Sequence, residues 1–263
     1  MEKIFIFKVG GKVIDDSEHL KKFLKDFAEI DAKKLLIHGG GKWVSDMSDR
    51  LGLKVNMRDG RRITDRDTLE VVKMILPGVA NKNIVSLLQR YGCNALGLTG
   101  ADGNMIKSIK RPIKNGIDFG YVGDVTEVNV VQLDIILQAG FVPVFTALTH
   151  DGNGQLLNTN ADTIASSLAI SLSSVYEVDL FYCLEKTGVL KDVFDEDSII
   201  KSINSENYKD LKEKGVIHSG MIPKIDNAFD AIKKGVFKVH ICHYKDVERI
   251  PKGDMDIGTL ISG

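Results

Sequence analysis

Two short segments near the amino terminus place glycines and a lysine directly after a run of apolar residues. They span residues 7–12 (FKVGGK) and 37–42 (IHGGGK). Glycines at the carboxyl end of a strand let backbone N–H groups approach an anion, and a following helix directs the positive end of its dipole there. One such segment is equally well explained as a tight turn. Two of them, each with an adjacent lysine, predict that both loops grip one polyphosphate.

Several common kinds of phosphate, metal and acyl-transfer site are excluded by pattern. The sequence has no G-x-x-x-x-G-K-[ST] loop, no G-x-G-x-x-G fingerprint, no H-E-x-x-H and no G-x-S-x-G. A His-Ile-Cys-His segment ends at His243, but alternation along a strand puts His240 and Cys242 on one face and His243 on the other. A fourth ligand is lacking, so we assign no metal site.

Two further segments could contribute to chemistry or could simply be well-formed helix starts. Residues 158–162 (NTNAD) open an apolar helical stretch, with Asn160 suited to cap it and Asp162 in its first turn. Residues 218–224 (HSGMIPK) form a glycine-bearing turn that leads into an amphipathic helix. On their own, neither segment identifies an activity.

The elements that must position these residues alternate along the chain. Short β-branched or aromatic runs are followed by amphipathic stretches, which predicts a three-layer αβα sandwich with a mainly parallel central sheet. The expected helices include 65–76, 78–91, 128–139 and 162–172, and the expected strands include 95–100, 141–148, 178–184 and 238–243.

The domain organisation is expected to have two parts. Residues 102–127 change to short, glycine-punctuated segments of mixed polarity, which predicts a β insertion over a pocket. A second β-α series begins after the helix at 162–172 without a Pro-rich or Ser-rich linker. We therefore place a boundary near residue 174, with domains 1–174 and 175–263.

Composition limits the partners and the compartment. The 263 residues carry 35 Lys+Arg and 36 Asp+Glu, a net charge of −1, so no global attraction to nucleic acid or to an anionic membrane is expected. Cys93, Cys183 and Cys242 are far apart and odd in number, which favours three buried thiols in a reducing cytoplasm. We expect neither a signal peptide nor a membrane-spanning stretch.

Taken together, the segments resemble the amino acid kinase family, and within it the N-acetyl-L-glutamate kinases, over nearly the whole chain. The resemblance rests on motifs that occur in the family's order, and a late Gly258-Thr259 adds to it. These are K-x-G-G at Lys8–Gly11, H-G-G-G at His38–Gly41, G-x-R-x-T around Arg62, A-N-K at Ala80–Lys82, N-x-N-A-D at Asn158–Asp162 and G-M-I-x-K at Gly220–Lys224.

The resemblance implies an engine for phosphoryl transfer from ATP, which is expected as its magnesium complex. Lys8 and Lys224 would contact the transferring group, with Asp162 holding the two lysines in place. Phosphoryl transfer spreads negative charge and needs in-line positioning, so two cations with an orienting carboxylate suit it. Phosphate contacts are also expected from backbone groups of the glycines in the two loops, namely Gly10, Gly11, Gly40 and Gly41.

The amino-acid substrate is implied in the same way. Arg62 and Asn158 match the residues that hold the α-carboxylate end of acetylglutamate, and Gly39 joins them in the substrate site. The γ-carboxylate would attack ATP to give an acyl phosphate, in the second step of arginine biosynthesis. It is already ionised at neutral pH, so no general base is assigned. Gly188 is expected to contact the nucleotide.

Departures from the family pattern leave alternatives open. Glu185 and Lys186 stand where the family has an Asp-containing segment, which puts the details of ATP contact in question. Basic side chains in the insertion and beside Arg62 could instead receive a second carboxylate, as in relatives that use N-succinyl-L-glutamate, although a solvated hairpin explains them too. These side chains are Arg61, Lys107, Lys110 and Arg111.

Two other classes of function remain as alternatives. A non-catalytic amino-acid or nucleotide sensor of the same fold would have been favoured by loss of either lysine, but both are present. A nicotinamide-dependent oxidoreductase is made remote by the missing fingerprint. By resemblance we expect small-molecule substrates and a homodimer that is not inhibited by arginine.

Overall fold

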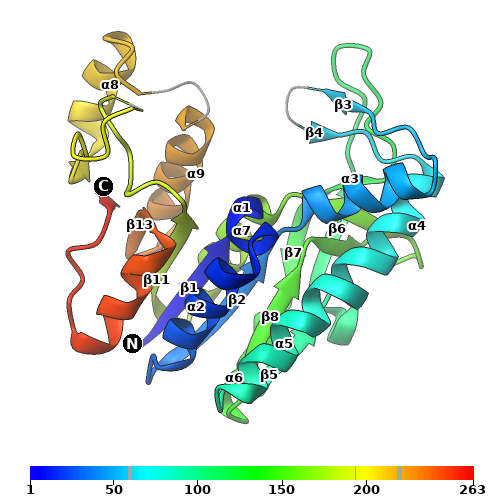
Figure 1. Cartoon of the computed structure of the whole chain (residues 1–263), viewed down its shortest axis with the longest axis horizontal. Helices are drawn as coiled ribbons and strands as arrows, with labels where there is room; N and C mark the ends of the chain where they lie inside the picture. The colour runs from blue at the N-terminus through cyan, green and yellow to red at the C-terminus, as the bar shows by residue number, and fades with distance from the viewer. Residues whose placement is uncertain (59–60, 193, 218–220) are drawn as a thin grey trace. The chain divides into compact units, whose positions relative to one another are not determined.

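The computed structural model describes residues 1–58, 61–192, 194–217 and 221–263. The chain forms two compact units, which are described in turn. The first contains residues 1–35 and 165–263, and the second contains residues 36–164 (Figure 1).

The first unit is built on five strands in the order β12–β14–β13–β11–β1. β1, β11 and β13 run parallel, and β14 is antiparallel to β13. Residues 4–9 of β1 are all buried, as expected for a nearly continuous apolar run inside a parallel sheet. The strands are β1 (Glu2–Val9), β11 (Tyr176–Leu184), β12 (Ser202–Ile203), β13 (Lys238–His243) and β14 (Thr259–Ile261).

The helix α2 shows how a helix of the first unit begins and packs. In α2 the side chain of Asp16 accepts hydrogen bonds from the backbone N–H groups of Glu18 and His19, which caps the first turn. Phe27 of this helix meets Phe7 of β1 edge-on, with ring centroids 5.3 Å apart. The helices are α1 (Gly11–Asp15), α2 (Ser17–Ala28), α8 (Ser205–Glu213), α9 (Ile222–Lys233) and the 3₁₀ segment η3 (Tyr244–Lys252).

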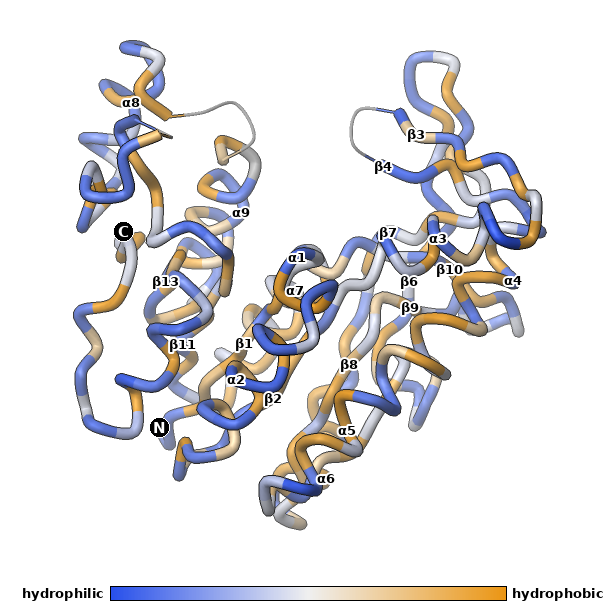
Figure 2. The backbone as a smooth tube through the Cα atoms, in the orientation of Figure 1, coloured by the Kyte–Doolittle hydropathy of each residue, from blue (hydrophilic) through white to orange (hydrophobic). Residues whose placement is uncertain are grey.

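The second unit combines a parallel sheet with a small barrel. β2, β8 and β5 pair in parallel, and β10, β7, β6 and β9 close a barrel. Figure 2 shows hydrophobic colour along β8, whereas α5 carries both hydrophobic and polar residues. The strands are β2 (Lys33–His38), which begins in the first unit, β3 (Met57–Arg58), β4 (Arg61–Arg62), β5 (Ala95–Leu98), β6 (Ile106–Lys110), β7 (Val122–Val128), β8 (Val142–Thr146), β9 (Leu148–His150) and β10 (Leu156–Thr159).

One long helical segment, Arg66–Arg90, dominates the helices of the second unit. The sequence predicts two helices here, and in the structure they are joined through a π-helical turn at Ile75–Ala80, where Pro77 supplies no backbone N–H. The helices are α3 (Gly41–Arg50), α4 (Arg66–Met74), η1 (Ile75–Ala80), α5 (Asn81–Arg90), the 3₁₀ turn η2 (Asp102–Asn104), α6 (Val130–Gln138) and α7 (Ala161–Leu172), which continues into the first unit.

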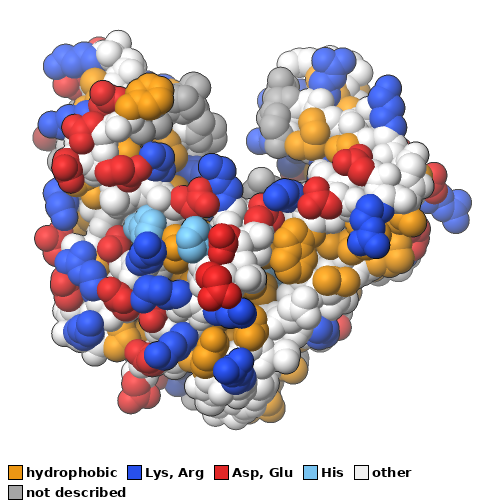
Figure 3. All heavy atoms as spheres, viewed as in Figure 1, with side chains coloured by type: hydrophobic (Ala, Val, Ile, Leu, Met, Phe, Trp, Pro, Cys, Tyr) orange, Lys and Arg blue, Asp and Glu red, His pale blue; other side chains and the backbone are white. Residues whose placement is uncertain are grey.

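The same segment is, by length and composition, apolar enough to cross a membrane, which differs from the sequence expectation. Leu69, Val72 and Leu76 nevertheless lie in the core cluster of the second unit, together with Val44 and Leu148. Core helices of folded domains meet the same length and composition criteria. On the face of the protein shown in Figure 3, acidic and basic side chains are interspersed, as the near-zero net charge predicts.

The predicted α/β class is confirmed, and the predicted insertion forms an antiparallel hairpin of β6 and β7. Its closure into a barrel with β9 and β10 was not predicted. The two units also divide the chain differently from a boundary near residue 174. All eight residues of β1 pair with β11, from Glu2–Tyr176 to Val9–Cys183, and this pairing places residues 1–35 with the carboxyl-terminal part.

The three cysteines are buried free thiols, as predicted. Cys242 and His240 are both buried in β13, and His243 is half-buried. His240 lies opposite Phe181 in the sheet and stacks on its ring, with centroids 4.8 Å apart. Burial, followed by the nearby charge of Lys238, lowers the pKa of His240 to about 4.

This buried histidine predicts acid sensitivity of the fold. Its pKa is lower in the folded chain than its usual 6.5, so the unfolded chain takes up a proton first as the pH falls. The stabilisation is fully present above pH 6.5 and declines towards pH 4, by about 3 kcal/mol for this group. Urea unfolding at pH 7.5, 5.5 and 4.5 measures the decline. In His240→Phe, which keeps an aromatic ring on Phe181, the decline should be shallower. Equal declines in both proteins would contradict this assignment.

Candidate functional site

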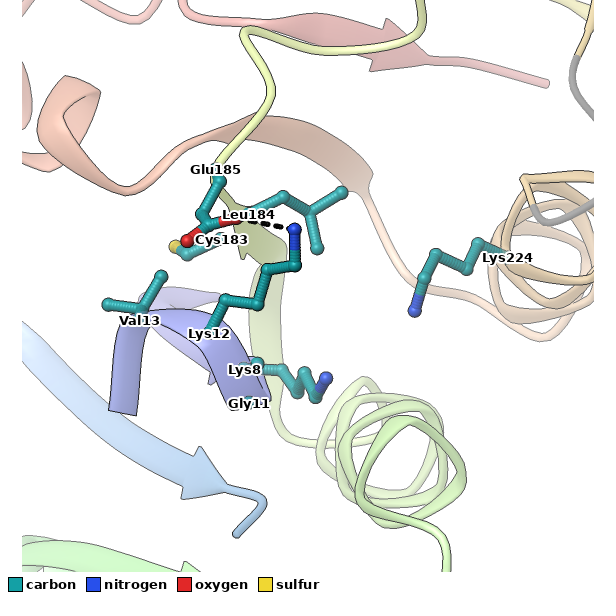
Figure 4. Close-up of a pocket in the computed structure, with 9 residues that line it drawn as sticks. Lys8, Gly11, Lys12, Val13, Cys183, Leu184, Glu185 and Lys224 are labelled. Atoms are coloured by element: carbon teal, nitrogen blue, oxygen red, sulfur yellow. Dashed lines mark ion pairs between the residues drawn. The ribbon is translucent and has the colours of Figure 1, made fainter. Parts of the chain in front are cut away.

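A pocket of about 220 Å³ lies at the carboxyl end of β1 in the first unit (Figure 4). Gly10 is the residue before α1, and Gly11 is its first residue. The first glycine-rich segment therefore does form a loop between a strand and a helix, as predicted. The pocket is lined by Lys8, Gly10, Gly11, Lys12, Val13, Cys183, Leu184, Glu185 and Lys224.

Two of the lysines come from separate elements of the first unit. Lys8 belongs to β1 and is only 8% exposed, and Lys224 belongs to α9. Figure 4 shows their side chains pointing towards the same space. The Nζ atom of Lys224 lies 5.8 Å from the ring centroid of Tyr182, a buried residue of β11. Two ammonium groups that share a small pocket can balance the charge of a phosphoryl group.

Gly10 keeps the space above Lys8 open. A Cβ atom at position 10 would lie 3.5 Å from the Nζ atom of Lys8 and 4.0 Å from the carbonyl oxygen of Cys183. These are ordinary contact distances, so a side chain would occupy pocket space without a steric clash. Glycine at position 10 is therefore better explained by the need for an open anion site than by backbone strain.

The segment that departs from the family pattern lies at the pocket edge. Glu185 forms an ion pair with Lys12, at 3.2 Å between Oε2 and Nζ, and Lys186 pairs with Glu196 outside the pocket lining. Gly188 has a packing role, because a Cβ there would lie 2.6 Å from the Oγ1 atom of Thr259. That oxygen accepts a hydrogen bond from the backbone N–H of Val189, at 2.9 Å. The late Gly258-Thr259 motif therefore fixes this turn.

The second glycine-rich segment links β2 to α3 in the second unit. Gly40 precedes α3 with φ of +139°, a conformation that side chains disfavour, and a Cβ there would lie 2.9 Å from Leu76 Cδ2. A Cβ atom at Gly39 or at Gly41 would meet no other atom of the described residues within 4 Å. The space beside their Cα atoms is therefore open at the start of a ten-residue helix.

His38, at the start of this segment, is held by Asn81, a residue of the A-N-K motif. The amide nitrogen of Asn81 lies 3.1 Å from Nε2 of His38 and 2.9 Å from the carbonyl oxygen of Val144. Nδ1 of His38 lies 2.8 Å from the carbonyl oxygen of Gly39. Burial lowers the pKa of His38 to about 4, so the ring is neutral, donates from Nδ1 and accepts at Nε2. Both motifs are evident in the sequence, whereas the contact between them is evident only in the structure.

The contact predicts a large stability cost for Asn81→Ala. Asn81 is 1% exposed, and its removal leaves the Val144 carbonyl group and His38 Nε2 without their donor. We expect the free energy of unfolding to fall by about 2–4 kcal/mol, since each buried unsatisfied group costs about 1–3 kcal/mol. Urea unfolding at pH 7.5 provides the measurement. Asn83→Ala, at an exposed position of the same helix, is the control and should unfold like the wild type. Equal stability of all three proteins would refute the role of Asn81.

Arg62 and Asn158 both lie in the second unit, on strands β4 and β10. The Nη2 atom of Arg62 donates to the carbonyl oxygen of Gly41 at 2.8 Å and to Oγ of Ser45 at 2.7 Å. Its Nη1 atom is buried and has no hydrogen-bond partner among the described residues. Asn158 donates to Oγ1 of Thr64 at 2.9 Å, and Thr64 is two residues after Arg62. Burial lowers the pKa of Arg62 from its usual value. An anionic ligand would satisfy the buried donor.

The start of α7 is capped as predicted. The side chain of Asn160 accepts hydrogen bonds from the backbone N–H groups of Asp162, at 2.8 Å, and Thr163, at 3.1 Å. Asp162 therefore lies in the first helical turn and is half-buried. Gly60 of the G-x-R-x-T motif, and residues 218–220 with Gly220 of the G-M-I-x-K motif, lie outside the described residues.

The sequence pattern of the amino acid kinase family matches residues 3–243. The chain belongs to the amino acid kinase family. This confirms the family predicted from the motifs. It also agrees with the α/β architecture described above.

Relatives within the amino acid kinase family match nearly the whole length of the chain. The acetylglutamate kinase of Cytophaga hutchinsonii is 52% identical over 99% of this chain and 99% of its own length. The acetylglutamate kinase of Phocaeicola vulgatus is 50% identical over 91% of this chain and 93% of its own length. Among solved structures, an N-acetylglutamate synthase from Neisseria gonorrhoeae shares the amino acid kinase fold, with a TM-score of 0.83 at 20% identity over 99% of this chain and 59% of that one.

Proposed function

We propose that the protein catalyses ATP-dependent phosphorylation of the γ-carboxylate of N-acetyl-L-glutamate, the second step of arginine biosynthesis. Relatives named acetylglutamate kinase support this proposal, at 52% identity over 99% of the chain and at 50% identity over 91% of it. The observation that carries the substrate assignment is Arg62, whose Nη1 atom is a buried donor without a partner among the described residues. A substrate carboxylate is an ideal acceptor for a guanidinium group.

The chemistry requires little from the protein beyond positioning and charge. An oxygen of the γ-carboxylate attacks the terminal phosphorus of ATP, and the bond from that phosphorus to the bridging oxygen breaks, which leaves ADP and an acyl phosphate. The carboxylate is ionised at neutral pH, so no proton is removed and no general base is needed. Stabilisation of charge on the moving group is then the main task.

We assign this task to residues that the family resemblance implies. Lys8 and Lys224 bind the phosphoryl group, and Asp162 orients them. The backbone N–H groups of Gly11, Gly40 and Gly41 donate to phosphate, Gly10 permits the approach, and Gly188 shapes the nucleotide turn. Arg62 and Asn158 bind the α-carboxylate end of the amino acid, beside Gly39.

The nucleotide is proposed to bind as its magnesium complex. The described residues contain no cluster of three or more His, Cys, Asp or Glu side chains that could hold a metal ion. Mg²⁺ usually keeps several waters and uses substrate phosphates as ligands, which suits a co-substrate complex without a protein cage. The residues that line the phosphate pocket come from β1, α1, β11 and α9. We therefore propose that the ATP-binding lobe, expected from the sequence to be residues 175–263, also includes residues 1–35.

The basic side chains of the insertion bear on the choice of acyl group. Lys107 pairs with Glu127 at 3.4 Å, and Lys110 pairs with Asp118 at 3.6 Å. Arg111 pairs with Asp124 at 2.6 Å and is the least exposed of the three. Each of these cations has an acidic partner in the hairpin, which accounts for them without a substrate carboxylate. The proposal keeps the acetyl group because the relatives at about half identity are named acetylglutamate kinase.

The test is ATP-dependent acyl-phosphate formation, trapped as the hydroxamate with hydroxylamine. N-acetyl-L-glutamate, N-succinyl-L-glutamate and free L-glutamate are compared side by side. The proposal expects the highest kcat/KM with the acetyl compound. Preference for the succinyl compound would keep the mechanism and overturn the acyl assignment. ATP binding without turnover of any substrate would instead support a sensor.

Assembly and location are proposed from the family resemblance alone. We expect a homodimer in the cytoplasm, without inhibition by arginine. Elution in gel filtration at the mass of a hexamer, or inhibition by added arginine, would contradict that expectation.

A further inference from the structure

The phosphate pocket of the first unit contains a third lysine and a carboxylate. Lys12 follows Gly11 in α1, and Glu185 follows the end of β11, and both line the pocket with Lys8 and Lys224. Figure 4 shows the ion pair of Lys12 and Glu185 as a dashed line at the pocket edge. Three cations and one anion therefore surround about 220 Å³.

The position of Glu185 is unfavourable for binding a polyphosphate. A carboxylate beside phosphates costs energy through like-charge repulsion, unless a cation neutralises it. Lys12 provides that cation, at 3.2 Å from Oε2 of Glu185. The same ion pair also engages Lys12, which directly follows Gly11 of the glycine loop and could otherwise contact a phosphate.

The ion pair is well placed to open. The side chain of Lys12 is 83% exposed and that of Glu185 is 34% exposed, so water screens their attraction and the pair contributes little to stability. A nucleoside triphosphate carries several negative charges and competes strongly with Glu185 for the ammonium group of Lys12. The long, flexible lysine side chain can turn between the two anions without a change in the backbone.

We propose that Lys12 binds the nucleotide phosphates by exchanging from Glu185, so that the ion pair tunes nucleotide affinity. This proposal rests on the proposed function, which places ATP in this pocket. Glu185 weakens nucleotide binding in two ways, because it holds Lys12 in the free protein and repels the phosphates.

The test compares Kd for MgATP and for ADP, measured by isothermal titration calorimetry, in Lys12→Ala and Glu185→Gln. Lys12→Ala should raise the Kd of MgATP about tenfold, as expected for loss of a charge-assisted contact. The effect on ADP, titrated as its magnesium complex, should be smaller, because MgADP lacks the terminal phosphate and carries one negative charge fewer than MgATP. Glu185→Gln should have the opposite sign and lower the Kd of MgATP about threefold, since it removes the repulsion and releases Lys12.

A matched control uses another lysine–glutamate ion pair of the same unit. Lys33 pairs with Glu2 at 2.7 Å, away from the pocket lining. Lys33→Ala should leave both dissociation constants unchanged. Thermal unfolding of every variant confirms that each one is folded at the temperature of titration.

Three results would overturn the proposal. An unchanged Kd in Lys12→Ala would mean that Lys12 does not contact phosphate. Weaker binding in both Lys12→Ala and Glu185→Gln would mean that the intact pair shapes the loop, and exchange would be wrong. If the wild type binds no ATP, the proposed function fails too, whereas ATP binding that is weakened by Lys8→Ala but not by Lys12→Ala refutes only the role of Lys12.

Discussion

Lys8→Ala should lower kcat about 10³-fold, which is the loss expected when one preorganised donor to a developing negative charge is removed. Lys8 lines the phosphate pocket from β1 and is more deeply buried than Lys224, at 8% exposure. Lys224→Ala should have an effect of similar size from the side of α9. The measurement is hydroxamate formation at saturating ATP and N-acetyl-L-glutamate, with circular dichroism to confirm the fold.

Lys34 offers a matched control for Lys8. It is also a buried lysine of the first unit, at 5% exposure, but its Nζ atom donates to the carbonyl oxygen of Ala28 at 3.0 Å and lies 5.0 Å from the ring centroid of Phe27. Lys34→Ala should therefore lower Tm and leave kcat of the folded protein unchanged. If Lys8→Ala also lowered only Tm, Lys8 would be a structural residue and its proposed role in phosphoryl transfer would be wrong.

Arg62→Ala should raise the KM for N-acetyl-L-glutamate about 100-fold while the KM for ATP changes little, because a bidentate, charge-assisted contact to a carboxylate is lost. Part of the loss would come from Gly41 and Ser45, whose oxygens accept from Nη2 of Arg62. Arg62→Lys keeps the charge but cannot serve these two acceptors and a carboxylate together. It should recover only a small part of the affinity.

Initial rates over a wide range of N-acetyl-L-glutamate concentration provide this measurement. Arg58→Ala is the control, since Arg58 lies in the neighbouring strand β3, pairs in register with Arg61 and is exposed. Its KM should match that of the wild type. A fall in kcat of Arg62→Ala at an unchanged KM would show that the guanidinium group acts on the transition state instead of on substrate binding.

Local sequence signals predicted most elements of this fold. The helix expected at 162–172 is found as Ala161–Leu172 with the expected cap at Asn160, and the expected strand 238–243 is β13. Closure of the barrel was not predictable in this way. β10 pairs with both β7 and β9, and nothing within residues 156–159 indicates these partners. Pairing over such distances depends on the whole fold.

The candidate site shows the same division between local and distant information. The glycine loops and the lysines were recognised as motifs, and the pocket brings Lys8, Gly10, Gly11 and Lys224 together. The partner of Lys12 was not foreseen, because Glu185 is far away in the sequence and was noted only as a departure from the family pattern. The hydrogen bond between Asn81 and His38 was likewise hidden, since the two residues belong to separate motifs.

The pairing of β1 with β11 has a consequence for synthesis on the ribosome. Residues 36–164 form one continuous stretch, so the second unit can make its internal contacts while the rest of the chain is still being translated. The first unit cannot do so, since β1 pairs with β11 along its full length and β11 begins only at Tyr176. The strand β1, which carries Lys8, therefore gains β11 as its partner only after the whole of the second unit has been made.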